Sequence, residues 1–246
     1  MSDVLVLCYH AVSPAWHANL SVTPEALEEQ LGKLVGRGWR GAVFRDAVLR
    51  PPWRKTLVVS FDDAFLSVRQ LAQPILSRFG LPGTVFAPTA FPSQDRTLLW
   101  PGLDHWAATA SAPELACMSW DDLRALVSDG WEVGSHTCTH PRLTALDDEA
   151  LRRELEESRR DCERQLGIRC DTLAYPYGAV DARVAHFTAE ANYSAAAALS
   201  SNLHAAGPHR WPRVGVYHGD RPWRFGLKVN PLARRVRASR MWPEGG

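Results

Sequence analysis

The sequence predicts an α/β fold, a distorted or incomplete (β/α) barrel of seven to eight strands formed as one domain over residues 1–246. Short apolar runs alternate with amphipathic helical stretches, a pattern typical of β/α units around a mostly parallel sheet. The run at residues 56–61 is apolar on both faces, as in a strand covered on both sides. The length also suits a one-domain barrel. An open doubly wound sheet is the alternative, because nothing in the sequence requires closure.

The first half of the chain supplies three expected strands and two expected helices. The strands are placed at residues 4–8, 42–44 and 56–61. The first helix begins at Thr23-Pro24, a capping residue followed by proline, and ends near Gly36. The second ends at Gly80, and Pro74 is expected to kink it.

The second half continues the alternation. Strands are expected at residues 84–87, 132–135, 172–175, 194–198 and 213–217. Helices are expected over residues 119–130, 148–166 and 181–191, followed by a basic C-terminal helix at about 222–241. Residues 88–112 form a long insertion, in which Trp100 and Trp106 favour an ordered loop over a cleft.

Composition indicates a soluble globular enzyme. The hydrophobic share is 46% and the formal net charge is +1, so there is no electrostatic reason to expect a nucleic-acid partner. The five cysteines are odd in number and lack paired spacing, which favours reduced thiols. With no transmembrane segment and no signal-peptide pattern in the sequence, we expect a cytoplasmic location.

The central feature is the pair Asp62-Asp63, which follows the apolar run at residues 56–61. In parallel α/β folds, sites are built at the C-terminal ends of strands. Two adjacent carboxylates repel each other unless a cation or a shared proton relieves the repulsion. Helix capping by one of the two acids is the alternative interpretation.

Two histidines favour the cation. His136 and His140, spaced i and i+4, are expected on one face of a helical turn, where both can bind one ion. With Asp63 they form a three-ligand site with an open position, typical of catalytic zinc. We therefore predict a divalent metal cofactor, with Zn²⁺ as first choice and Co²⁺, Ni²⁺ or Fe²⁺ as alternatives. Cys138, between the histidines, is interpreted as a small buried thiol rather than a fourth ligand.

Three segments together resemble the polysaccharide deacetylase family, the NodB-like carbohydrate esterases of family 4. They are residues 60–63 (Ser-Phe-Asp-Asp), 136–140 (His-Thr-Cys-Thr-His) and 174–178 (Ala-Tyr-Pro-Tyr-Gly). The resemblance implies a distorted (β/α) barrel and metal-dependent removal of acyl groups, commonly acetyl from amino sugars. It also implies that Asp62 is the catalytic base, that Asp63, His136 and His140 hold the metal, and that the turn at Tyr177 and Gly178 stabilises the oxyanion.

The sequence departs from the family pattern in three places. Ala174 stands where the family often has an arginine that steadies the base, and Ala64 stands where glycine is usual. No segment matches the late motif that usually carries the acid. By elimination, the acid is His10 or His218, since both follow expected strands. His10 is preferred, because residues 9–12 (Tyr-His-Ala-Val) resemble an element of circularly permuted deacetylases; the alternative is a histidine that is merely hydrogen-bonded at a strand end.

The predicted function is a metal-dependent hydrolase that removes an N-acetyl or other acyl group from an amino sugar or polysaccharide. A deformylase or non-sugar amidase on the same scaffold is one alternative, and a catalytically silent, metal-containing carbohydrate-binding protein is another. An N-acetylated sugar or glycan is thus the expected partner. The cluster Arg234, Arg235, Arg237 and Arg240 is interpreted as a solvated helix face, with an anionic lipid or polyanion site as the alternative.

Overall fold

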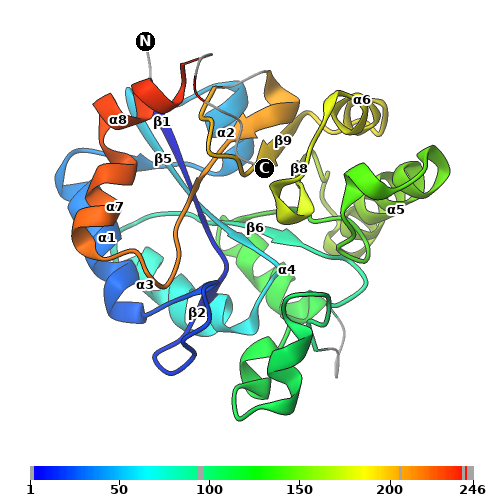
Figure 1. Cartoon of the computed structure of the whole chain (residues 1–246), viewed down its shortest axis with the longest axis horizontal. Helices are drawn as coiled ribbons and strands as arrows, with labels where there is room; N and C mark the ends of the chain where they lie inside the picture. Colours follow the sequence, from blue (N-terminus) through cyan, green and yellow to red (C-terminus); the bar gives the residue numbers. More distant parts are fainter. Residues whose placement is uncertain (1–2, 93–96, 205–206, 240–241, 243–246) are drawn as a thin grey trace.

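The computed structural model describes residues 3–92, 97–204, 207–239 and 242. Within them one sheet has the strand order β10-β9-β8-β7-β6-β5-β1-β11, with β4 paired to β5, and every pairing is parallel. The helices surround these strands (Figure 1). The strands are β1 (Asp3–Tyr9), β4 (Arg40–Gly41), β5 (Lys55–Asp62), β6 (Thr84–Ala87), β7 (Glu132–Ser135), β8 (Thr172–Ala174), β9 (Ala195–Ala198), β10 (Trp211–Pro212) and β11 (Val214–Gly215).

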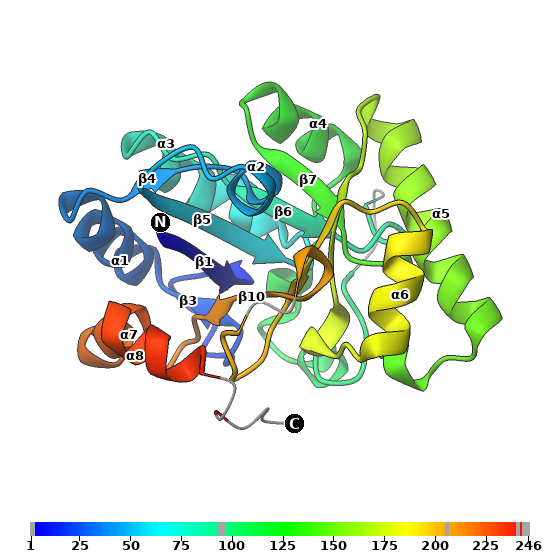
Figure 2. The same ribbon diagram turned by 90° about the horizontal axis from the view of Figure 1, so that it is seen from above.

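The two ends of this strand order meet. β10 pairs with β9 and β11 pairs with β1, yet only Arg213 separates β10 from β11. One extended stretch therefore joins both ends, and the fold is the predicted distorted barrel rather than an open sheet. Figure 2 shows β1, β5, β6 and β7 side by side. A separate two-stranded sheet consists of β2 (Ala11–Val12) and β3 (Ser21–Val22).

Local sequence signals explain where the helices begin and end. Thr23 caps the first helix by accepting a hydrogen bond from the Ala26 N–H, and Ser119 and Asp122 form a capping box. Gly167, with φ of 69°, ends the longest helix. The helices are α1 (Pro24–Gly36), α2 (Phe44–Leu49), α3 (Gln73–Arg78), α4 (Trp120–Ser128), α5 (Asp148–Leu166), α6 (Ala182–Glu190), α7 (Pro222–Val229) and α8 (Pro231–Arg237).

Several elements differ from prediction. The strand expected at residues 42–44 is wrong: β4 ends at Gly41, and α2 begins at Phe44, whose buried side chain belongs to the core. The helical segment that contains Pro74 is not a uniform α-helix: a π-helical turn at Val68–Ala72 directly precedes α3, and Pro74 lies in the first turn of α3.

The basic segment at the C-terminus also differs. Residues 222–237 form two helices instead of one, because Pro231 has no N–H to continue α7 and the Asn230 side chain caps α8. Residues 240–241 of the expected helix lie outside the described part of the chain.

All five cysteines are free, as expected. Among the described residues, none of the helices combines the length and apolar character needed to cross a membrane.

Candidate active site

Asp62 and Asp63 lie where β5 ends, and both are buried. The backbone reverses immediately after Asp62, because Asp63 and Ala64 adopt left-handed φ angles of 72° and 56°. This turn directs the two neighbouring carboxylates to different groups of side chains.

Asp63 faces both predicted histidines. Its Oδ1 lies 3.3 Å from His136 Nε2 and 3.4 Å from His140 Nε2. The three possible ligand atoms lie within 4.8 Å of one another, and all three residues are buried. The structure thus brings together the residues predicted to hold a metal.

The backbone conformation that brings the two histidines together differs from the predicted one. Residues 136–140 form an irregular loop after β7, in which Thr137 and His140 have left-handed φ angles of 68° and 61°, so the expected helical turn is wrong. Glu154 of α5 holds the loop by accepting hydrogen bonds from the N–H groups of Cys138, at 2.8 Å, and Thr139, at 3.0 Å. The Cys138 thiol donates to the Glu154 carbonyl, so it is directed toward α5.

The chemistry of this cluster fits a cation. The Ala174 carbonyl, 2.8 Å from His136 Nδ1, can only accept, so Nδ1 carries a proton and Nε2 is the ring nitrogen that faces Asp63 and is placed to bind a metal. Asp63 Oδ1 is buried without a hydrogen-bond partner among the described residues. One carboxylate oxygen and two imidazole nitrogens form a donor set suited to zinc and similar divalent metals.

The charges of the cluster are coupled. Burial alone would raise the pKa of Asp63, but the two histidines hold that pKa well below its ordinary value. Burial also disfavours the charged form of His136 and by itself would lower its pKa, but the neighbouring Asp62 and Asp63 raise that pKa above its ordinary value. For His140, burial prevails and the pKa is lowered.

Asp62 has a different partner, Arg213, which sequence analysis missed. The fully buried guanidinium binds both carboxylate oxygens, with Nη1 2.6 Å from Oδ1 and Nη2 2.7 Å from Oδ2. Burial opposes ionisation of Asp62, but Arg213 and His136 outweigh it and lower its pKa. Arg213 thus supplies a cation beside Asp62, although position 174 is alanine. The sequence feature that could have indicated this role was a charged residue in the apolar strand predicted at residues 213–217.

His10 adjoins Asp62. It follows β1, whose register pairs Tyr9 with Phe61, so His10 comes level with Asp62. Ligand atoms of Cys8, His10 and Asp62 lie within 4.8 Å of one another, and His10 Nδ1 is buried without a hydrogen-bond partner in the described structure. Burial lowers the pKa of His10.

His218 is placed differently. Its side chain is exposed, and its ring packs edge-on against His17 with 5.2 Å between centroids. The structure therefore brings His10, rather than His218, next to the carboxylates.

The turn at Tyr177 and Gly178 borders the cluster. Both residues have left-handed φ angles, 59° and 67°, and a Cβ on Gly178 would lie 2.4 Å from the Leu199 carbonyl oxygen, so only glycine fits. The Tyr177 ring lies 4.7 Å from the His140 ring. Because the Gly178 N–H donates to the Tyr175 carbonyl, the Tyr177 N–H is the candidate oxyanion donor.

The long insertion contributes Trp100. Its ring stacks on His140 with 4.0 Å between centroids and 20° between planes. Trp106, by contrast, packs edge-on against Trp16, 5.7 Å away. Trp100 thus fixes the orientation of one candidate ligand, while residues 93–96 of the insertion lie outside the described part of the chain.

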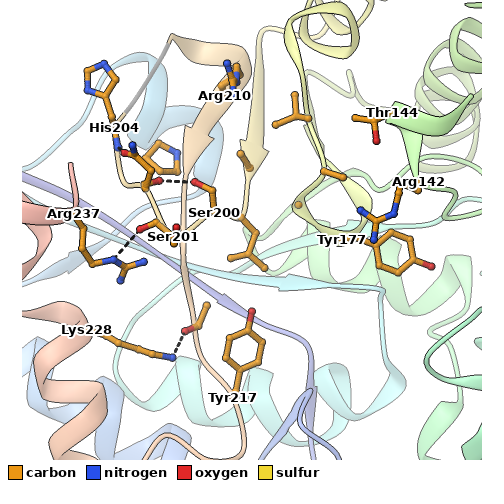
Figure 3. Close-up of a pocket in the computed structure, with 18 residues that line it drawn as sticks. Arg142, Thr144, Tyr177, Ser200, Ser201, His204, Arg210, Tyr217, Lys228 and Arg237 are labelled. Carbon is orange, nitrogen blue, oxygen red and sulfur yellow. Dashed lines mark hydrogen bonds between the residues drawn. The ribbon is translucent and has the colours of Figure 1, made fainter. Parts of the chain in front are cut away.

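A cavity of about 910 Å³ adjoins the buried cluster without including its carboxylates in the lining. It begins at Arg142 and Tyr177 and extends to Tyr217, Lys228 and Arg237 (Figure 3). Tyr177 and Gly178 therefore form the border between the cavity and the candidate metal site.

Comparison with known proteins gives consistent matches. A family model described as polysaccharide deacetylase matches residues 50–196, more than half of the chain. This range contains both carboxylates and both candidate metal-binding histidines, but neither His10 nor Arg213. The chain is 20% identical over 178 residues to "Putative polysaccharide deacetylase YxkH" of Bacillus subtilis (strain 168), an alignment that covers 70% of this chain and 56% of that protein. The chain therefore spans little more than half of that relative's length.

Two solved structures share the fold. The Streptococcus pyogenes deacetylase PplD, in complex with acetate, has a TM-score of 0.75 at 22% identity, covering 93% of this chain and 98% of the other. BC0361, a polysaccharide deacetylase from Bacillus cereus, has a TM-score of 0.74 at 21% identity, covering 92% of this chain and 69% of the other. These likenesses confirm the predicted barrel.

Proposed function

The chain belongs to the polysaccharide deacetylase family, and on that basis we propose that it is a metal-dependent hydrolase that removes an N-acetyl group from an amino sugar or glycan. One observation carries the proposal: two adjacent carboxylates have different partners. Asp63 faces two imidazoles, whereas Asp62 is paired with a guanidinium. A metal-dependent hydrolase that activates water needs both metal ligands and a base, and this arrangement can supply them.

In this proposal Asp63, His136 and His140 hold a divalent metal, with Zn²⁺ as first choice. The metal, when bound, would acidify water and polarise the acyl carbonyl. Trp100 and the Ala174 carbonyl orient the two imidazoles through stacking and a hydrogen bond.

Asp62 is the proposed base. Its lowered pKa keeps it ionised near neutrality, so it can accept a proton from the attacking water. The bidentate contact with Arg213 fixes the carboxylate plane. The Tyr177 N–H is the proposed donor to the oxyanion.

His10 is the proposed acid, which protonates the departing amine. Its lowered pKa makes the imidazolium a stronger proton donor, although it also narrows the pH range in which the proton is held. His218 remains the alternative.

Arg213 favours an active enzyme over a silent binding protein, because it restores a cation beside Asp62 despite Ala174. A deformylase or non-sugar amidase would use the same groups, so substrate tests must separate these activities.

The test combines metal analysis with product release. The purified protein is assayed for bound metal, then for acetate release from a panel of N-acetyl amino sugars and their oligomers, and for formate release from N-formyl counterparts. We expect about one metal per chain and preferential release of acetate. Preferential release of formate would favour the deformylase, and metal binding without release of either acid would contradict the proposed hydrolase.

A further inference from the structure

The cavity beside the candidate active site extends across the mouth of the barrel. Figure 3 shows Arg142 and Tyr177 on one side, Lys228 and Arg237 on the other, and Ser200 and Ser201 between them. A volume of about 910 Å³ lies at the upper end of the range for ligand sites. A substrate whose acyl group reached past Tyr177 would therefore have its neighbouring units in this cavity.

The charge of the lining is one-sided. Four of the lining residues are arginine or lysine, and none is aspartate or glutamate; the cations are Arg142, Arg210, Lys228 and Arg237. The whole chain is nearly neutral, with 28 Lys and Arg against 27 Asp and Glu. Many surface arginines outside the cavity pair with acids, as Arg160 does with Glu156 at 2.7 Å. The cavity therefore concentrates positive charge.

Two of the guanidinium groups have no carboxylate partner among the described residues. Arg142 lies over the Tyr177 ring, 4.9 Å from its centroid. Arg237 donates from Nε to the Ser201 carbonyl at 3.0 Å, and partial burial lowers its pKa. Lys228 differs, because it already pairs with Asp220.

Arg237 is partly buried, and a partly buried cation without a counter-charge is unfavourable, which a bound anion would relieve. Arg142 is exposed at the edge of the cavity and adds attraction for an anion there. Guanidinium groups match carboxylate and phosphate oxygens through paired hydrogen bonds. The Ser200 side chain and the neighbouring backbone add polar groups suited to sugar hydroxyls.

We propose that this cavity binds anionic groups of the substrate, carboxylates or phosphates on the units next to the acetylated sugar, with Arg142 on one side of the cavity and Arg237 on the other. The natural substrate is accordingly a negatively charged glycan. That the bound glycan is a substrate rests on the proposed function, but anion binding by the cavity can be measured without turnover.

The first test measures binding of probes that carry no acyl amide. Calorimetry compares a tetrasaccharide of galacturonic acid, a glycerol phosphate tetramer and a neutral tetrasaccharide of galactose on the metal-loaded protein. We expect at least one anionic probe to bind about 10-fold or more tightly than the neutral one, and its affinity to fall as salt rises. The tighter of the two anionic probes identifies the carboxylate or the phosphate.

Matched variants locate the site. Arg237→Gln and Arg142→Gln should each weaken anion binding by about 10-fold, because each removes a charge-assisted contact. Arg160→Gln, which removes an equal charge from the exposed face of α5, should leave it unchanged. Equal binding of charged and neutral probes, or an equal loss in Arg160→Gln, would overturn the proposal.

The second test uses two acetylated substrates of equal length, a neutral N-acetylglucosamine hexamer and a hexamer alternating N-acetylglucosamine with glucuronic acid. The ratio of kcat/KM for the charged over the neutral substrate should fall about 10-fold in Arg237→Gln, mainly through KM. Anion binding without deacetylation of either hexamer would reject the proposed function alone. Deacetylation without anion preference would reject this inference alone.

Discussion

Two groups of titratable side chains lie next to each other at the mouth of the barrel, and each has the composition of a metal site. One is Asp63 with His136 and His140, and the other is Asp62 with Cys8 and His10. In both groups the possible ligand atoms lie within 4.8 Å of one another. Proximity alone therefore does not distinguish them.

The difference lies in the counter-charge. Asp62 is already neutralised by Arg213, and burial raises the pKa of the Cys8 thiol, which disfavours the thiolate that a metal requires. Asp63 has no such cation, and its Oδ1 has no hydrogen-bond partner in the described structure. We therefore assign the proposed roles from the partner of each carboxylate rather than from its position in the motif: Asp63 is the proposed metal ligand, and Asp62 is the proposed base.

The largest effect is expected from removal of a proposed ligand. His140→Ala should reduce bound metal from about one per chain to a small fraction. Activity should fall by more than the 10- to 100-fold typical of losing a group that only supports a ligand. Plasma mass spectrometry of the dialysed protein measures the metal. Cys138→Ala is the control and should keep it, because that thiol is directed toward α5; full occupancy in His140→Ala would contradict the assignment.

Arg213→Gln tests the second group. Leaving the Asp62 carboxylate buried without its cation should lower the free energy of unfolding by about 3–5 kcal/mol, as measured by urea denaturation at pH 7. Arg213→Lys keeps the charge but loses the paired contact, so its loss should be smaller. Unchanged stability in Arg213→Gln would mean that the ion pair does not hold Asp62.

The same pair predicts a pH dependence. The pKa of Asp62 is lowered in the folded protein, so its stabilising contribution is complete above the unfolded value of about 3.9 and is lost as pH falls through the folded value. Without Arg213, burial should raise that pKa. The acid limb of kcat/KM should therefore move to higher pH in Arg213→Gln than in the unaltered enzyme; a shift to lower pH would contradict the account.

His10→Ala should have a selective effect. Loss of a general acid should lower kcat on an amide by about 10²-fold or more, but should affect an activated ester much less, because its leaving group needs no proton. Activity on the amide should also decline as pH rises through the pKa of His10, which burial holds below its ordinary value. Equal losses on both substrates reject this role, and a selective amide defect in His218→Ala transfers it.

The smallest effect is expected at Ala64, where the chain reverses between the two groups. Ala64→Gly removes left-handed strain of about 1–2 kcal/mol. Two effects oppose this gain. The greater entropy of glycine in the unfolded chain lowers the free energy of unfolding by about 0.4–1 kcal/mol, and the loss of a buried methyl group lowers it by about 0.8 kcal/mol. The net change in unfolding free energy should be under about 1 kcal/mol in thermal melts. A loss above about 2 kcal/mol would show that the methyl group helps to shape the turn.

Much of the barrel and of the first group could be predicted from sequence, because both depend on local patterns. The buried run of β5 and the caps of α1 and α4 are read from neighbouring residues. The site follows from them, since parallel strands bring Asp63 and His136 to the same end of the barrel.

The remaining features depend on contacts between distant residues. Arg213 meets Asp62 across 151 positions because β10 and β11 join the two ends of the sheet, and no local pattern specifies that closure. The loop at residues 136–140 was wrongly predicted as a helical turn because its shape depends on Glu154 of α5. The i and i+4 spacing gave the correct neighbours for the wrong reason.

The most direct test of the different roles exchanges each carboxylate for its amide. Asp62→Asn should retain about one metal per chain, with a native circular dichroism spectrum, yet lose about 10²-fold or more in kcat because an amide cannot accept the proton. Asp63→Asn should lose the metal, since the amide is a weaker ligand without charge. Equal metal loss in both variants, or loss in Asp62→Asn with retention in Asp63→Asn, would contradict the account.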